Sequence, residues 1–487
     1  MFNQYPESKD FAKITLSCLA DKRVYSSVIT SSSTNLAIIK IPTRQFKNDP
    51  ALLFGAESSI SGIIVCEQTG GGATGPNFCF IDGDAYTLFK RARVLHGSTV
   101  LNDLSMFAQY AHCEDDMTLS PADKHSRSIT HATSDVQYAE NFPTYTITLP
   151  GVYTPGPTTG TYTNTQVFQN QALNSSQMGY SPTFAGGVAY IPFSINLKNF
   201  LGNAIDHPIP LHLLTNNDLI LEIELETCQN IQICDNTSNQ INSISICELQ
   251  YNAVISKIPW SVSQLLFPNT EATLIGIDKR NDFRHIPQNV TTINVQYDNF
   301  KYHYARAVIF FFTNLASRND QTKAFITQRQ KGYICSYNLM YNNKTYPNKR
   351  IDNVADMFNQ TLKCFESTKS SITYLQYSNN QLSSGEDDYL YDNGITDYLG
   401  PDYTKIKRFI GGVNLQRYHS DDKHFRGIDI SDSALSLNID LASVAYSVSG
   451  MKTVTPQPLG PPNCYLVSYC IYDVKYVITN GDIKVID

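Results

Sequence analysis

Two short segments gather imidazole and carboxylate groups at a density that suits a divalent cation. They comprise His112, Glu114, Asp115 and Asp116 in the first half of the chain, and His419, Asp421, Asp422 and His424 in the second half. A metal site needs its ligands to converge with supporting hydrogen bonds, whereas neighbouring acids on a loop usually point apart into solvent. We therefore interpret both segments as solvated acidic loops, with a bound ion as the alternative. Calcium would be the favoured ion if either segment lay at a subunit contact.

Residues 70–75 have the glycine density of a phosphate-binding loop. The run lacks the Gly-Lys-Ser/Thr ending and the helix start whose amides would hold a phosphate, so it is interpreted as a flexible loop between strands. The sequence also has no Gly-x-Ser-x-Gly elbow, His-Glu-x-x-His helix or EF-hand loop. Distant acids such as Asp115 and Asp421 could still meet and hydrolyse a glycoside. On balance the sequence predicts no catalytic, metal or cofactor site.

The 11 cysteines are an odd number, and no pair has the Cys-x-x-Cys spacing. The closest pairs are Cys228 with Cys234 and Cys464 with Cys470. We expect reduced, buried thiols that pack as small hydrophobic groups, with a zinc site or a disulfide framework as the alternative. The sequence shows no leader peptide and no apolar run of about 20 residues. It therefore predicts a chain that is made in a reducing compartment and does not span a membrane.

Charged residues are scarce, and the few present are acidic on balance. They make up 17% of the chain, against about 25% in an average soluble protein. A surface rich in Asn, Gln, Ser, Thr and Tyr is typical of surfaces that contact other proteins. The net charge of −7, without an arginine-rich arm, argues against specific nucleic-acid binding as the main function. Stacking of sugars on the Tyr-rich loops is a possible second role.

Alternation of apolar and polar residues is the main structural signal. In residues 219–226, Leu and Ile occupy one face while Glu222, Glu224 and Glu226 occupy the other, which predicts a strand with one buried face. Similar runs occupy residues 36–41, 144–149, 305–313, 434–441 and 465–478. Only three segments indicate helices: one capped at Asn102-Asp103, one starting near Asp352, and one at residues 260–267. Many strands and few helices predict an all-β chain of sandwiches.

The order of these elements repeats. Residues 86–95 form a predicted strand followed by a turn and a helix, and residues 333–341 begin the same series in the second half. We predict a first sandwich at residues 1–258, a linker at 259–290 and a second sandwich at 291–487. Long polar loop insertions are expected at about 113–187 and about 366–401, because loops of this length in a compact domain are usually functional or disordered.

Several stretches resemble the double jelly-roll major capsid proteins of eukaryotic DNA viruses, of the polinton-like virus, virophage and adintovirus type. Residues 86–101 resemble the family's strand and Gly-Ser/Gly-x-Val-Leu turn, and residues 191–219 resemble the end of its first jelly roll. Residues 409–428, with Gly411-Gly412-Val413-Asn414-Leu415 and Phe425-Arg426-Gly427-Ile428, are similar to the second jelly roll. Residues 483–487 resemble its terminal strand. The motifs occur in family order.

The resemblance implies two tandem eight-stranded jelly-roll sandwiches with a few short helices and long loops. It also implies a structural protein without enzymatic activity, found in the virion capsid. The implied partners are two further copies in a homotrimer, neighbouring trimers, a penton protein and minor or cement capsid proteins. Proteolytic maturation and an internal membrane are left open. The alternative is a receptor- or glycan-binding β-sandwich of the spike or lectin type, and a β-sandwich hydrolase is the enzyme alternative.

Overall fold

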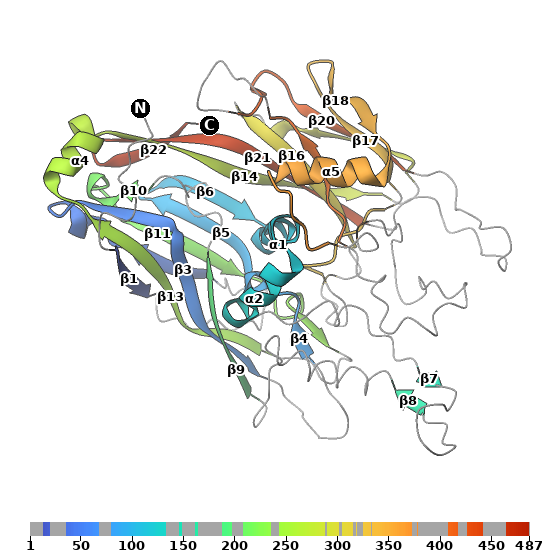
Figure 1. Cartoon of the computed structure of the whole chain (residues 1–487), viewed down its shortest axis with the longest axis horizontal. Coiled ribbons are helices and arrows are strands. Elements are labelled where there is room, and N and C mark those ends of the chain that lie inside the picture. Colours follow the sequence, from blue (N-terminus) through green and yellow to red (C-terminus); the bar gives the residue numbers. More distant parts are fainter. Residues whose placement is uncertain are drawn as a thin grey trace.

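The computed structural model describes residues 13–19, 36–67, 79–132, 146–148, 161–163, 188–196, 208–234, 243–287, 290–300, 304–314, 318, 325–332, 334–372, 377, 408–416, 426–441 and 464–486. Within these residues it consists mainly of antiparallel sheets with a few short helices (Figure 1). None of the described helices is long and apolar enough to cross a membrane.

The first sandwich consists of two sheets that share one apolar core. One sheet has the strand order β1-β13-β3-β10, with β9 also paired to β3, and the other has the order β2-β11-β5-β6. The bounds are β1 (Lys13–Leu19), β2 (Leu36–Ile41), β3 (Ala51–Glu67), β5 (Phe89–His96), β6 (Thr99–Ser105), β9 (Val188–Asn196), β10 (Ile209–Pro210), β11 (Leu219–Leu225) and β13 (Ser243–Lys257). Two short ladders pair β4 (Cys79–Ile81) with β12 (Gln232–Cys234), and β7 (Thr146–Thr148) with β8 (Thr161–Thr163).

The second sandwich repeats this topology. One sheet has the order β14-β21-β16-β19, with β22 also paired to β21, and the other has the order β15-β20-β17-β18. The bounds are β14 (Ala272–Ile286), β15 (Thr292–Tyr297), β16 (Ala305–Asn314), β17 (Ile334–Tyr341), β18 (Lys344–Ile351), β19 (Gly411–Asn414), β20 (Leu435–Leu441), β21 (Cys464–Thr479) and β22 (Asp482–Ile486). The two four-strand orders of the first sandwich match the two four-strand orders of the second, strand for strand. This repeat of eight strands confirms the predicted double jelly roll.

Strand β11 shows how the sequence pattern produces this topology. Leu219, Leu221 and Ile223 are fully buried in the core. On the opposite, more polar face Glu224 Oε1 lies 2.6 Å from Lys90 Nζ of the neighbouring strand β5, and Glu222 pairs with Arg93. The buried face and the row of cross-strand ion pairs fix one register, because a slip by one residue would bury the glutamates.

Two of the three helix predictions are confirmed. Helix α5 (Val354–Cys364) begins after Asn353, whose side chain accepts a hydrogen bond from the Asp356 amide, and α4 (Trp260–Leu266) lies between the sandwiches in the sequence. The prediction of a helix capped at Asn102-Asp103 is wrong. Residues 99–105 form β6, which is paired with β5, and the helix starts only after Met106.

The predicted linker and first insertion also need correction. Only the first part of residues 259–290 connects the sandwiches, because residues 272–286 form β14, which pairs along its whole length with β21. The insertion expected at residues 113–187 begins inside helix α1 (Phe107–Thr118) and continues as α2 (Pro121–His131). Of the second insertion, residues 366–372 and residue 377 are described, and the rest lies outside the described residues.

Candidate functional site between the two sandwiches

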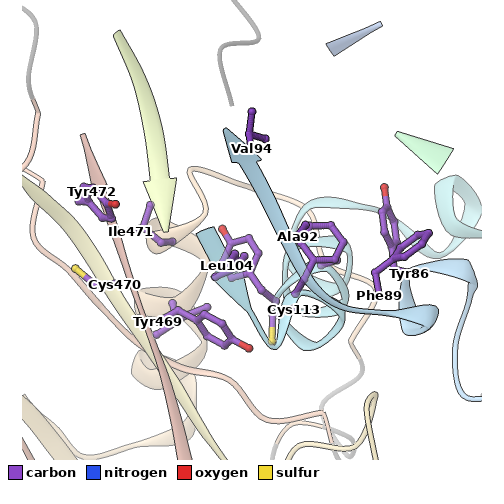
Figure 2. Packing of buried hydrophobic residues seen from close by; sticks show 14 of the residues in the cluster. Tyr86, Phe89, Ala92, Val94, Leu104, Cys113, Tyr469, Cys470, Ile471 and Tyr472 are labelled. Carbon is purple, nitrogen blue, oxygen red and sulfur yellow. The ribbon is translucent and has the colours of Figure 1, made fainter. Parts of the chain in front are cut away.

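Helix α1 belongs to the first sandwich but packs against β21 of the second. The rings of Tyr110 and Tyr469 meet edge-on with centroids 5.2 Å apart, and the Tyr469 hydroxyl donates a hydrogen bond of 2.9 Å to the Met106 carbonyl. Figure 2 shows Tyr469 beside Leu104 and Cys113. These side chains are buried, and the apolar cores of the two sandwiches form one continuous cluster. The sandwiches are therefore joined by core packing as well as by the chain.

A polar seam runs along β6 and β14, one strand from each sandwich. The Asp278 carboxylate accepts hydrogen bonds from the Asn102 amide and, at 3.0 Å, from the Tyr472 hydroxyl. Farther along the seam, Ser105 Oγ donates to Asn281 Oδ1 at 2.7 Å. Side chains thus connect the two strands here, and they satisfy polar groups that burial would otherwise make costly.

The turn after β4 is held by the second sandwich through Asp82. This fully buried carboxylate accepts hydrogen bonds from three consecutive backbone amides, those of Phe325 (3.0 Å), Ile326 (2.7 Å) and Thr327 (3.2 Å). The Thr327 hydroxyl also donates to it. Burial raises the pKa of Asp82, and the four hydrogen bonds oppose this rise.

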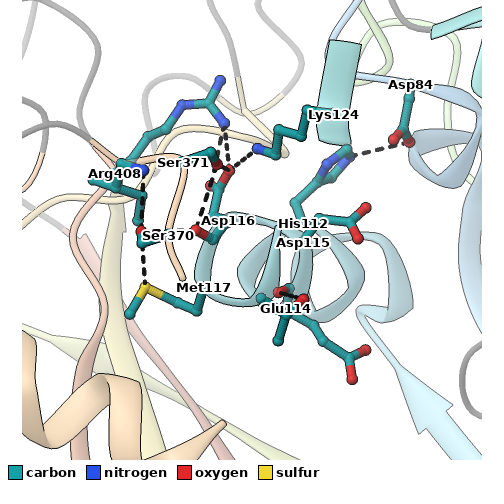
Figure 3. Close-up of polar contacts among 12 residues, drawn as sticks. Asp84, His112, Glu114, Asp115, Asp116, Met117, Lys124, Ser370, Ser371 and Arg408 are labelled. Atoms are coloured by element: carbon teal, nitrogen blue, oxygen red, sulfur yellow. Dashed lines mark hydrogen bonds and ion pairs between the residues drawn. The ribbon is translucent and has the colours of Figure 1, made fainter. Parts of the chain in front are cut away.

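Among the described residues, the Asp116 carboxylate on α1 forms ion pairs with three cations, two of them from the second sandwich. Arg408 Nη1 lies 3.1 Å from both carboxylate oxygens, and Arg329 and Lys124 also form ion pairs with them. Figure 3 shows Arg408, Lys124 and Ser371 converging on Asp116. Asp116 and Arg329 are fully buried. Two cations from the second sandwich are therefore anchored on one carboxylate of the first.

Electrostatics keep the Asp116 carboxylate ionised despite its burial. Burial alone would raise its pKa, but the positive charges of Lys124, Arg408 and Arg329 together hold the pKa well below its ordinary value. The backbone carbonyl of Asp116 also accepts hydrogen bonds of 2.9 Å from the Ser371 amide and the Ser370 hydroxyl. This residue therefore binds three separate segments of the second sandwich, at Arg329, residues 370–371 and Arg408.

The ion site that was the alternative interpretation of residues 112–116 does not form in this geometry. The segment is helical, so Glu114, Asp115 and Asp116 point in different directions, and Figure 3 shows Glu114 directed away from Asp116. Asp115 instead lies 3.4 Å from Arg127. Among the described residues, no group of three or more His, Cys, Asp or Glu side chains could hold a metal ion. The interpretation of a solvated loop is equally wrong, because His112, Asp115 and Asp116 are buried.

His112 is a structural residue of this interface. Its Nε2 lies 2.9 Å from the Thr87 hydroxyl and 3.8 Å from an Asp84 oxygen. A Cβ atom at Gly83 would lie 2.6 Å from its ring and 2.7 Å from Thr327, so the glycine allows the two sandwiches to approach closely. The imidazole therefore fills a space between a turn of the first sandwich and a loop of the second.

We expect His112 to make the fold sensitive to acid. Burial lowers the pKa of His112 in the folded protein to about 3, whereas a histidine in the unfolded chain has a pKa of about 6.5. Between these values the unfolded chain binds a proton that the folded chain does not, so stability is lost as the pH falls through this window. In this pH window the free energy of unfolding should fall less steeply in His112→Gln than in the wild type. The difference in slope should be up to about 1.4 kcal/mol per pH unit.

The measurement is urea unfolding at several pH values between about 6.5 and about 4, where the histidine contribution is expected. His285→Gln, which changes an exposed histidine of β14, is the control and should keep the wild-type slope. Burial also lowers the pKa values of His96 and His212, so part of the acid sensitivity should remain in the variant. An unchanged slope in His112→Gln would contradict the assignment.

The remaining sequence candidates fall into two groups. Cys464 and Cys470 lie on the same strand, β21, and both are free and buried, as are Cys66, Cys113, Cys228 and Cys364. Cys247 and Cys335 are free but exposed, so the expected burial is wrong for these two, and the side chain of Cys234 lies outside the described residues. His419, Asp421, Asp422, His424 and residues 70–75 lie outside the described residues.

Sequence analysis missed Asp82, Arg329 and Arg408 as interface residues. Each belongs to no recognised motif, and its partners are far away in the sequence. The contact between Arg329 and Asp116 spans 213 positions and that between Arg408 and Asp116 spans 292. A local motif search has no signal for such contacts.

Comparison with known proteins gives a likeness in structure but none in sequence. The sequence matches no protein-family model and no curated protein. Among solved structures, VP54 of PBCV-1, fitted into a reconstruction of the virophage Sputnik, is 9% identical, with a TM-score of 0.54 over 100% of this chain and 99% of the other. The Faustovirus major capsid protein is 7% identical, with a TM-score of 0.51 over 98% and 92%. A chain of the Sputnik virophage is 13% identical, with a TM-score of 0.50 over 97% and 88%. The likeness therefore concerns the fold, and it extends over nearly the whole of each chain.

Proposed function

We propose that this chain is a structural major capsid protein whose trimers, hexagonal in outline, tile an icosahedral virus shell. The observation that carries the proposal is the full-length match in fold to capsid chains such as VP54 of PBCV-1, which extends over both sandwiches. A partial match to one sandwich would fit many unrelated β-sandwich proteins, because a fold alone does not define a function. The match over both sandwiches is much more specific.

The repeated topology supports a hexagonal building block. Each chain carries two sandwiches with the same strand order, so a three-fold axis would place six similar sandwiches in a ring. For this ring to tile a lattice, the angle between the two sandwiches of each chain has to be constant. The buried ion pairs of Asp116 and the amide contacts of Asp82 restrict that angle.

The partners follow from this role. Each trimer would contact neighbouring trimers through large surfaces, and a penton protein together with minor or cement proteins would complete the shell. The composition fits such contacts, since charged residues make up only 17% of the chain. We propose neither enzymatic activity nor specific nucleic-acid binding. The geometry of Asp116, whose oxygens are paired with three cations, serves structural anchoring.

The test is the oligomeric state of the purified full-length protein. Light scattering during gel filtration should give a mass three times that of the single chain, and negative-stain electron microscopy should show particles with a hexagonal outline. Under assembly conditions the trimers should form closed shells.

A stable monomer at high protein concentration would contradict the proposal. Specific sugar binding by such a monomer on a glycan array would instead support the alternative, a glycan-binding β-sandwich.

A further inference from the structure

The contact between the two sandwiches of one chain uses particular strands of each. The edge strand β6 of the first sandwich lies against the edge strand β14 of the second, where Asn102 donates a hydrogen bond to Asp278. Directly after β6, the Met106 carbonyl accepts a hydrogen bond of 2.9 Å from Tyr469 of β21, the strand next to β14. The first sandwich therefore contributes β6 to this contact, and the second contributes β14 and β21.

Each of these strands has an equivalent in the other sandwich. In the strand orders, β18 occupies the place of β6, β1 the place of β14, and β13 the place of β21. Figure 1 shows β18 and β13 on opposite sides of the molecule, so a chain cannot bring its own two strands together. Every chain therefore has one complete contact and the two separate halves of a second one.

The burial of the strands shows which of these halves are covered. In β21 every residue from Leu466 to Val474 is buried, so both faces of the strand are covered. In its equivalent β13 buried residues alternate with half-exposed ones, and Gln250, Asn252 and Val254 form the half-exposed face. The centre of β6 has two consecutive buried residues, whereas in β18 only Ile351 is buried. One chain thus leaves a face of β13 and most of β18 open.

The two open surfaces carry opposite charge. Strand β18 contains three cations, Lys344, Lys349 and Arg350, and no acid. Lys344 is exposed, and Lys349 is still 77% exposed in its ion pair with an acid that follows the strand.

The surface of β13 and its neighbour β3 is acidic on balance. Glu57, Glu67 and Glu248 are exposed there, and Lys257 is the one cation of the two strands. Opposite charges on two surfaces favour their encounter and fix their relative orientation.

We propose that β18 of one copy packs against the half-exposed face of β13 in the next copy, as β6 packs against β14 and β21 within a chain. The inference rests on the proposed trimer and names the surfaces that form it. Because the two surfaces lie on opposite sides of the chain, the contact is head-to-tail, and three such contacts close a ring. Around this ring, contacts within a chain alternate with contacts between chains.

Carbodiimide cross-linking of the full-length protein tests the contact directly. The reagent joins a lysine amine to a carboxylate without a spacer, so it links only groups that touch. We expect cross-linked dimers and trimers on a denaturing gel. Peptides from these bands should join Lys344 or Lys349 to Glu57, Glu67 or Glu248.

Charge reversal on β18 should prevent the contact. Lys344→Glu combined with Lys349→Glu places acids against the acidic surface of the next copy, and like charges in an interface are strongly unfavourable. Light scattering during gel filtration should then give the mass of a single chain at a concentration where the wild type is a trimer. The matched control combines Lys40→Glu with Lys484→Glu, at exposed lysines of β2 and β22, and should remain trimeric.

The possible outcomes separate this inference from the proposed function. If the folded β18 double variant remains a trimer, or if the wild-type trimer gives cross-links that do not involve β18, the proposed contact is wrong while the capsid role stands. A monomeric wild type would contradict the proposed function itself, and the contact with it. If the double variant does not fold, as judged by circular dichroism, the cross-links of the wild type still decide.

Discussion

Replacing Asp116 with Asn is expected to lower the free energy of unfolding by about 3–5 kcal/mol, because it leaves buried cations without a counter-charge. Arg329 is fully buried and Arg408 nearly so, and both ion pairs are made with this one carboxylate. The Asn side chain has the same shape, so the loss reports the charge and not a cavity. Urea unfolding followed by intrinsic fluorescence measures it.

Asp49→Asn is the matched control for this substitution. Asp49 pairs with Lys257 across the surface, and about half of each side chain is exposed. Exposed ion pairs contribute about 0–1 kcal/mol, so the control should unfold close to the wild type. If Asp116→Asn were no more destabilising than Asp49→Asn, Asp116 would not be the anchor of the interface. Because these ion pairs restrict the angle between the sandwiches, we also expect the Asp116 variant to form fewer of the proposed trimers.

The strand content could be predicted from the sequence because sheet burial has a period of two. The alternation at residues 219–226 and 434–441 corresponds to β11 and β20, which have identical patterns of alternating burial. The same reasoning succeeded for α5, where Asn353 caps a helix with a clear apolar stripe. The burial pattern of these elements can be seen in residues that are close in the chain, although the strands themselves pair with distant partners.

The errors arose where distant partners override a local preference. Asn102 and Asp103 have the composition of a helix cap, yet Asn102 donates to Asp278 of the other sandwich and Asp103 pairs with Arg91 of β5. The end of the predicted linker forms β14 because β21 provides a partner for every residue from Ala272 to Ile286. Neither Asp278 nor β21 is visible in a local window of sequence around the residues that it pairs with.

The candidate site could be located but not understood from sequence. The acidic segment at residues 112–116 attracted attention because of its charge density, and it does lie at the interface between the two sandwiches. Its role was misjudged because the nature of the site is set by Arg329 and Arg408, which have no motif of their own. Acids that face arginines serve as anchors, whereas acids that face one another would have suited a cation.

Gly427→Ala is expected to cost about 3 kcal/mol or more, although it adds one methyl group. A Cβ atom at residue 427 would lie 2.2 Å from the Tyr304 carbonyl oxygen and 2.3 Å from its carbonyl carbon. These are backbone atoms, so no side chain can rotate away. Relief requires the segment to move off β16, which breaks the two hydrogen bonds of 2.9 Å between Ala305 and Ile428.

The same movement would disturb a buried carboxylate. Asp473 Oδ2 accepts hydrogen bonds from the amides of Arg426 (2.8 Å) and Gly427 (3.0 Å), while its other oxygen accepts one of 2.6 Å from Arg306. The Phe-Arg-Gly-Ile sequence at residues 425–428 therefore requires glycine for a physical reason. Only a residue without a side chain allows the backbone to approach β16 and Asp473 together.

Gly62→Ala in β3 is the matched control, since its nearest neighbour is the methyl group of Ile246 at 3.1 Å, with other contacts at 3.2 Å. Small shifts of these neighbours can absorb the added methyl group, and alanine also restricts the unfolded chain. We expect the free energy of unfolding to change by no more than about 1 kcal/mol in either direction. Thermal unfolding of both variants makes the comparison. Equal stability of Gly427→Ala and Gly62→Ala would show that the segment at residue 427 can move away from β16 at little cost, and the explanation of this glycine would then be wrong.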